Sequence, residues 1–193
     1  MKNRYILLFA LLVTLYSCQP ELDEFSPSGG SADFSTYVAL GNSLTAGYAD
    51  GSLYRSAQLN SYPSILAEQF KAIGGGNFEQ PLMNGEYGIA PGKLKLGYPT
   101  DCLGNVSLGP VPDVGPLDPV ASIGYAVNNL GVPGAKSAHL LFPGYAAFNP
   151  YFARFASSPT ATVVGDALAQ NPTFFTLWIG NNDALGCDFG WGW

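Results

Sequence analysis

Three residues of this chain stand where a predicted strand ends and could carry chemistry: a serine, a glycine and an asparagine. Ser43 follows the apolar run 37–40, and Gly41 and Gly47 supply the backbone freedom that a sharp strand-to-helix turn requires. A serine in such a turn is a candidate nucleophile. Taken alone, however, the four residues Gly-Asn-Ser-Leu are better explained as ordinary turn chemistry.

Two later segments place small or amide residues in the same position. Residues 125–141 predict a strand, a turn that contains Gly134, and the start of a helix, whereas residues 172–186 predict an apolar strand that runs into a turn with Asn182. In an open parallel sheet, ligands bind at the edge formed by the carboxyl ends of the strands. Each residue alone also has a structural explanation: a helix-start glycine for Gly134 and a turn asparagine for Asn182.

Acyl transfer is the chemistry that would use these groups together. Attack of serine on an ester builds negative charge on the carbonyl oxygen, and one fixed hydrogen-bond donor lowers that barrier by about 3 kcal/mol. The N–H groups of Ser43 and Gly134 and the side-chain amide of Asn182 could converge if the three strands are neighbours. We therefore predict hydrolysis of carboxylic esters through an acyl-serine intermediate.

The three segments resemble, in order and spacing, the first three sequence blocks of the SGNH hydrolases, also called GDSL esterases and lipases, over roughly residues 36 to 186. "GNSL" matches the first block with Asn42 in place of aspartate, "GVPGAKS" the second and "GNND" the third. The resemblance implies a three-layer α/β/α sandwich with a parallel, flavodoxin-like sheet. It also implies that Ser43 is the nucleophile and that Ser43, Gly134 and Asn182 supply the oxyanion donors.

The fourth block of that family, Asp-x-x-His, does not occur in the sequence. The single histidine, His139, lies five residues after Gly134 on a predicted helix, among apolar neighbours that favour packing over a role as base. A nucleophilic serine without its base loses about four to six orders of magnitude in rate. We therefore expect the chain as written to be nearly inert.

Truncation is the simplest explanation for the missing block. The chain stops soon after the third predicted strand, with neither a closing helix nor a sheet partner, so the catalytic histidine and aspartate are expected in sequence absent here. The rival explanation is a catalytically dead surface lipoprotein that binds a glycan or a lipid.

Residues 1–17 are predicted to be a signal peptide, because Lys2 and Arg4 precede an apolar stretch too short to span a bilayer comfortably. "LYSC" at 15–18 resembles a bacterial lipobox, which implies lipidation of Cys18; an ordinary signal peptide with an incidental cysteine is the alternative. The acidic residues that follow resemble the export signal of surface lipoproteins in Bacteroidota-like bacteria. We expect an outer-membrane lipoprotein, exposed at the surface or facing the periplasm.

The rest of the chain is divided into a tether, 18–35, and one incomplete hydrolase domain, 36–193. Helices are predicted at 61–74 and 161–170 from their apolar spacing. The long Gly- and Pro-rich segment 74–123 contains enough apolar residues to predict an ordered cap over the sheet edge; an excursion packed elsewhere on the sheet is the alternative.

Composition excludes some partners. A net charge of −6 offers no basic surface for nucleic acid. One histidine and scattered acids predict no metal site, and the glycine-rich turns lack nucleotide fingerprints, so no cofactor is implied. Asp183 is expected to orient the loop of Asn182, and Asp50 and Asp166 to be solvated. Cys102 and Cys187 could form a disulfide in an oxidising compartment.

Overall fold

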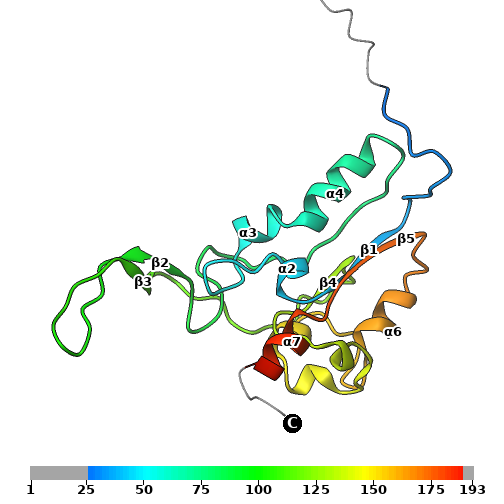
Figure 1. The fold of residues 1–193 in the computed structure, drawn as a ribbon. Coiled ribbons are helices and arrows are strands. Elements are labelled where there is room, and N and C mark those ends of the chain that lie inside the picture. The colour runs from blue at the N-terminus through cyan, green and yellow to red at the C-terminus, as the bar shows by residue number, and fades with distance from the viewer. Residues whose placement is uncertain (1–25, 189–193) are drawn as a thin grey trace, which may run out of the picture.

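The computed structural model describes the backbone of residues 26–188 and the side chains as far as residue 186 (Figure 1). The predicted signal peptide, the lipidation site Cys18 and the acidic residues that follow it lie outside the described residues. Within the described part, no helix is long and apolar enough to cross a bilayer.

A three-stranded parallel sheet forms the centre of the fold. Strand β1 (Tyr37–Gly41) lies in the middle, with β4 (Asn129–Gly131) on one side and β5 (Phe174–Trp178) on the other. Gly41 is level with Gly131 in one neighbour and with Trp178 in the other, so all three carboxyl ends reach the same edge. The mixed α/β class and the adjacency of the three strands are therefore confirmed.

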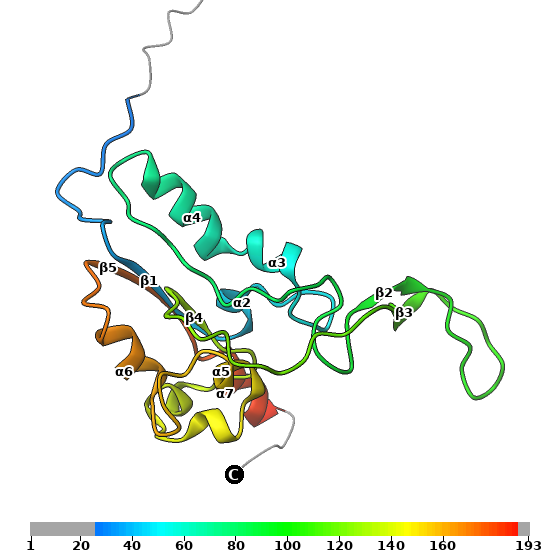
Figure 2. The same ribbon diagram turned by 180° about the vertical axis from the view of Figure 1, so that it is seen from behind.

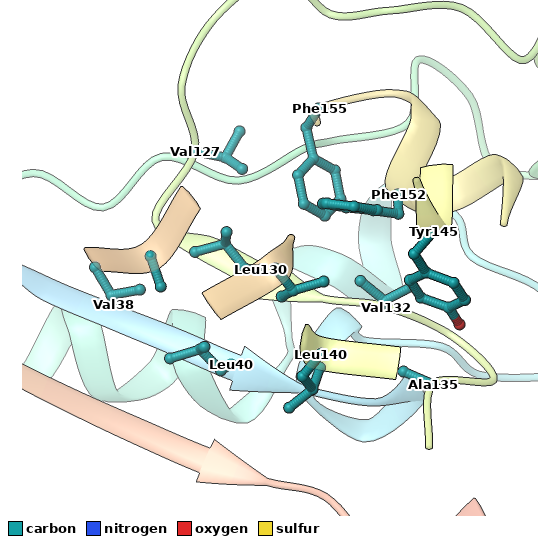
Figure 3. Packing of buried hydrophobic residues seen from close by; sticks show 12 residues of the cluster. Val38, Leu40, Val127, Leu130, Val132, Ala135, Leu140, Tyr145, Phe152 and Phe155 are labelled. Carbon is teal, nitrogen blue, oxygen red and sulfur yellow. The ribbon is translucent and has the colours of Figure 1, made fainter. Parts of the chain in front are cut away.

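Helices cover both faces of the sheet (Figures 1 and 2). On one face, Tyr37 and Ala39 of β1 pack with Ala67 of helix α4 (Tyr62–Lys71). On the other, Val38 and Leu40 join the largest core cluster, which includes residues of helix α6 (Val163–Leu168), α5 (Pro150–Ala153) and the two 3-10 turns η1 (Ser137–Leu141) and η2 (Tyr145–Ala147). Figure 3 shows these side chains around Leu130. Successive side chains of β1 point to opposite faces of the sheet, so this strand packs against both helical layers.

The two helices predicted from apolar spacing are present, as α4 and α6. Thr162 caps α6 by accepting a hydrogen bond from the N–H of Gly165, and Pro63 stands in the first turn of α4. The prediction of an α-helix after Gly134 was wrong, because the chain there makes only the 3-10 turn η1. Pro143 disfavours helical backbone at Phe142, which is extended and ends the turn.

Three further helices and a hairpin complete the described elements. Helices α2 (Ser43–Ala46) and α3 (Arg55–Leu59) follow β1, and α7 (Asn181–Asp188) follows β5. The expectation that no helix closes the third strand was therefore wrong. The chain between α4 and β4 contains strands β2 (Leu94–Gly97) and β3 (Gly109–Pro112), which pair antiparallel.

The segment 74–123 divides into two parts in the structure. Met83 and Ile89 pack with Ala46 and Leu53 in a small core cluster beside α2. The β2–β3 hairpin instead projects from the body in both views (Figures 1 and 2). The cap predicted for 74–123 stays a prediction, and as the hairpin lies in the structure it would take no part in it.

The hairpin also decides the predicted disulfide. Cys102, in the loop between β2 and β3, is exposed and free in the structure. Cys187 belongs to α7, and its side chain lies outside the described residues, whereas the hairpin that contains Cys102 projects from the body (Figure 1). The Cys102–Cys187 pair is therefore not formed.

Candidate active site

The turn after β1 is held in place by Asn42, which is 1% exposed. Its backbone N–H donates to the carbonyl of Trp178 over 3.1 Å, and its side-chain oxygen accepts from the N–H of Leu44, which caps α2. Ser43 thus begins α2 directly above the end of the central strand. Gly47 ends this one-turn helix in the left-handed conformation, as expected for a sharp turn.

Asn181 links this turn to the third strand. Its Oδ1 accepts one hydrogen bond from Asn42 Nδ2 and another from Trp178 Nε1, each of 3.1 Å. An aspartate at position 42 could not donate to this oxygen, because an ionised carboxylate only accepts hydrogen bonds. An asparagine at position 42 therefore suits this turn, because its amide can donate to the side-chain oxygen of Asn181.

The second strand brings Gly134 to the same edge. The N–H of Val132 donates to the carbonyl of Gly41 over 2.9 Å, so the chain leaving β4 stays beside the end of β1. Gly134 has φ +80°, and a Cβ there would meet nothing within 4 Å. Glycine is therefore required by the left-handed backbone and not by lack of space.

Asn182 reaches back from α7 to the chain after Gly134. Its Nδ2 donates to the carbonyl of Ala135 over 2.8 Å. Next to it, Asp183 accepts from both the N–H and the hydroxyl of Ser137, at 2.9 and 3.1 Å. These bonds tie the start of α7 to η1 and fix the direction of the Asn182 amide, in line with the orienting role expected of Asp183.

Three donors at this edge remain unused within the described part of the chain. Neither the N–H of Ser43 nor that of Gly134 donates a hydrogen bond to a described residue. The amide of Asn182 carries two hydrogens, and the bond to Ala135 uses one. Backbone N–H groups in folded proteins normally have a hydrogen-bond partner. The partner of these donors would therefore be a ligand or solvent.

His139 is engaged in its own turn. Its Nδ1 accepts from the N–H of Lys136 over 3.2 Å, and its ring packs 4.7 Å from that of Tyr145. This arrangement fits the packing role expected from its neighbours. No group of three or more His, Cys, Asp or Glu side chains that could hold a metal occurs among the described residues.

The two carboxylates expected to be solvated have hydrogen-bond partners. Asp166 is half-buried and accepts from the N–H of Ser157 over 3.1 Å and from its hydroxyl, so full solvation was wrong for this residue. Asp50 is exposed, and it accepts from the hydroxyl of Tyr54. This bond, followed by burial, raises the pKa of Tyr54 to about 12.

A pocket of about 550 Å³ lies beside the Ser43 turn and was not anticipated from the sequence. Leu44, the residue after Ser43, forms part of its wall, and so does Trp178 at the end of β5. The other wall residues come from the end of α2 through α3 to the start of α4: Gly47, Tyr48, Ala49, Tyr54, Ser56, Ala57, Asn60, Ser61 and Tyr62. No single motif marks this set, because the fold assembles it from separate segments.

Comparisons with known proteins add no relative: no protein-family model, curated protein or solved structure matches the chain. The class is therefore defined by the fold and the site alone. The chain is a mixed α/β protein with a parallel sheet, and Ser43, Gly134 and Asn182 stand on the loops and helix starts that follow its three strands.

Proposed function

We propose that this chain carries the nucleophile and the oxyanion donors of a serine ester hydrolase of the SGNH type, built as a three-layer α/β/α sandwich. The strand order β4-β1-β5 is the observation that carries the proposal. It supports convergence of Ser43, Gly134 and Asn182, because each residue follows a strand that ends at the same edge. Helices on both faces of the sheet are compatible with such a sandwich.

In this proposal, Ser43 Oγ attacks the carbonyl carbon of an ester, the alcohol leaves with a proton, and water then hydrolyses the acyl-serine. The carbonyl oxygen becomes negative and accepts hydrogen bonds from the N–H groups of Ser43 and Gly134 and from Asn182 Nδ2. One such donor contributes about 3 kcal/mol to the barrier. The bond from Asn182 to Ala135 favours catalysis, since it holds the amide in place before substrate binds.

The proton of Ser43 needs an acceptor, and no described residue forms a hydrogen bond with the Ser43 hydroxyl. His139 is the single histidine, and its Nδ1 already accepts the Lys136 N–H. We propose that the catalytic histidine and aspartate are supplied by sequence that the 193 residues do not contain. Without them, Ser43 would retain only the rate that the oxyanion donors provide.

The proposed location is the bacterial outer membrane, with Cys18 lipidated and the domain held at the surface by the tether. The lipobox-like sequence and the acidic residues after it support this proposal. The substrate would then be an ester of a lipid or of an acylated glycan.

Labelling with a serine-reactive fluorophosphonate tests the proposed activity. The natural gene should be expressed to its stop codon, and the adduct located by mass spectrometry. We expect an adduct on Ser43 that falls at least a hundredfold in Ser43→Ala. Ser107→Ala, an exposed serine of the β2–β3 hairpin, is the matched control and should label like the wild type. Undiminished labelling of Ser43→Ala would refute the nucleophile.

A catalytically dead binding lipoprotein is the second candidate, and the lack of an available histidine favours it. In that case the complete gene product would give no adduct at Ser43 while the pocket beside it still binds a ligand. The same labelling experiment therefore separates the two functions.

A further inference from the structure

We propose that the chain has a second binding site, for a free α-amino acid, in two adjoining cavities that share Arg154. The site is separate from the candidate active site, because none of Ser43, Gly134 and Asn182 lines either cavity. The inference therefore does not depend on the proposed esterase. It is carried by two opposite charges that line one cavity without pairing.

The two cavities share three wall residues: Ser122, Tyr125 and Arg154. The smaller cavity, of about 200 Å³, lies between the segments 82–84 and 118–125. The larger cavity, of about 480 Å³, extends from the chain before β4 to the end of α6. Since β4 runs toward Gly134, residues that precede it lie toward the opposite end of the sheet from the candidate active site.

Arg154 supplies a buried positive charge. It is 4% exposed, and its Nη1 and Nη2 donate to the carbonyls of Pro81 and Leu82, each over 2.8 Å. Both acceptors are neutral, and no ion pair joins Arg154 to a carboxylate of the described residues. A guanidinium has five N–H groups, of which these bonds use two. Donors therefore remain for a carboxylate, the group that arginine binds through paired N–H groups.

Asp118 supplies the opposite charge in the smaller cavity. It is half-buried, and its Oδ2 accepts the N–H of Gly85 over 3.0 Å, whereas its Oδ1 accepts from no described residue. Burial lowers the pKa of Arg154, and the charges of Tyr125 and Asp118 oppose that effect. The carboxylate thus lies near the guanidinium without pairing with it. The ammonium and carboxylate groups of a zwitterion would complement both charges.

The sizes of the cavities divide the ligand into two parts. The smaller cavity lies below the range of about 300–1,000 Å³ for small-molecule sites, so it suits only the charged head of an amino acid. The side chain would enter the larger cavity, where Asp166 disfavours an acidic group. The apolar residues of that wall, three of which belong to the main core cluster (Figure 3), are Ala126, Val127, Leu130, Phe155, Ala156 and Ala169.

Isothermal titration calorimetry of the full chain with L-leucine tests the proposal. Two analogues of the same carbon skeleton each lack one charge: 4-methylpentanoate has no ammonium group, and 3-methylbutylamine has no carboxylate. Each analogue should bind at least tenfold more weakly than L-leucine. Absence of L-leucine binding would show that only water lies between the two charges, and equally tight binding of either analogue would also overturn the proposal.

Two aspartates of one segment provide a matched pair of variants. Asp118→Asn can still accept the N–H of Gly85 but offers no charge to an ammonium group, so L-leucine affinity should fall at least tenfold. The affinity for 4-methylpentanoate should not fall. Asp113 is also half-buried but lines neither cavity, and Asp113→Asn should bind L-leucine like the wild type. Undiminished L-leucine affinity in Asp118→Asn would refute the site.

Arg154→Lys tests the other end of the ligand. Lysine keeps the charge but not the planar set of donors, so L-leucine should bind at least tenfold more weakly while the affinity for 3-methylbutylamine stays unchanged. If this variant does not fold, the analogues and Asp118→Asn still decide the question. Ser43→Ala should bind L-leucine like the wild type, so loss of the esterase would leave this site in place.

Discussion

The sheet and the β2–β3 hairpin contain similar apolar residues in opposite surroundings. All five residues of β1 are buried, and Leu130 of β4 is 1% exposed. In and around the hairpin, Leu96 is 71% exposed and Leu103 83% exposed. The comparison teaches that apolar content alone does not place a segment in the core. A segment also needs another layer of the fold to pack against, and no described element packs on the hairpin in this way.

The same contrast applies to polar groups. At the sheet edge, Asn42 is buried and makes four hydrogen bonds, to residues of β5, α2 and α7. In the hairpin loop, Asn105 donates to the carboxylate of Asp101, but both residues are exposed. A lost bond at the edge leaves a buried group without a partner, whereas water can replace a lost bond in the loop.

The largest expected effect comes from truncating one leucine in each region. Leu130→Ala removes a side chain from the centre of the main core cluster and should lower the free energy of unfolding by about 2–5 kcal/mol. Leu96→Ala should change it by less than about 0.5 kcal/mol. Urea denaturation of the two variants measures both values, and similar losses would show that the hairpin is packed in solution.

Asn42→Asp should be the next largest change. The carboxylate cannot donate to Asn181, so a group that is buried at position 42 loses its partner, and the expected loss is about 1–3 kcal/mol of unfolding free energy. Asn105→Asp is the matched exchange in the exposed loop and should cost less than about 0.5 kcal/mol. Equal denaturation midpoints for wild type and Asn42→Asp would rule out the bond to Asn181.

Alkaline pH should lower the free energy of unfolding, because two buried tyrosines have raised pKa values. Burial raises the pKa of Tyr37 to about 12, against an opposing hydrogen bond with Thr176, and burial likewise raises that of Tyr151 to about 12. The unfolded chain releases these protons first, so their contribution to stability is complete below pH 10 and is lost between pH 10 and 12. Tyr37→Phe should flatten this decline in unfolding free energy; a steep decline that persists unchanged would contradict the assignment.

The smallest expected effect is confined to the loop between β2 and β3 and occurs at acid pH. Hydrogen bonds from the side chain and backbone of Asn105 hold the pKa of Asp101 below its usual value of 3.8. Their contribution to loop order is present above that value and is lost as the pH falls through the lowered pKa. Amide hydrogen exchange at Asn105 should therefore quicken below pH 4 beyond the intrinsic rate, while that of β1 stays slow. Unchanged protection of Asn105 at acid pH would refute this account.

The strands that hold the candidate site could be predicted because their signals are local. An apolar run followed by glycine or asparagine marks β1 and β5, and their carboxyl ends lie level as expected. Helix α5 also has a local signal that sequence reasoning overlooked. Asn149 accepts hydrogen bonds from two backbone N–H groups at its start, and Pro150 follows as the first helical residue.

Other features depend on contacts between distant segments. Strand β3 contains Pro110 and Pro112, which argue against a strand, yet it pairs because a two-stranded hairpin leaves outward positions that need no donor. The pocket requires Trp178 to lie against residues more than a hundred positions earlier, which only the β1–β5 pairing brings about. Neither feature has a signal within a short sequence window.

The outer position of β5 affects how this chain behaves in solution. Five uncharged residues, Phe-Phe-Thr-Leu-Trp, pair with β1 along one side, and Phe175 is 61% exposed. No described strand pairs with its other side, and an apolar strand left unpaired on one side is a template for self-association into β-aggregates. The strand whose last residue accepts the Asn42 N–H is thus also a target for solubility engineering, where Phe175→Lys would add a charge that opposes self-association.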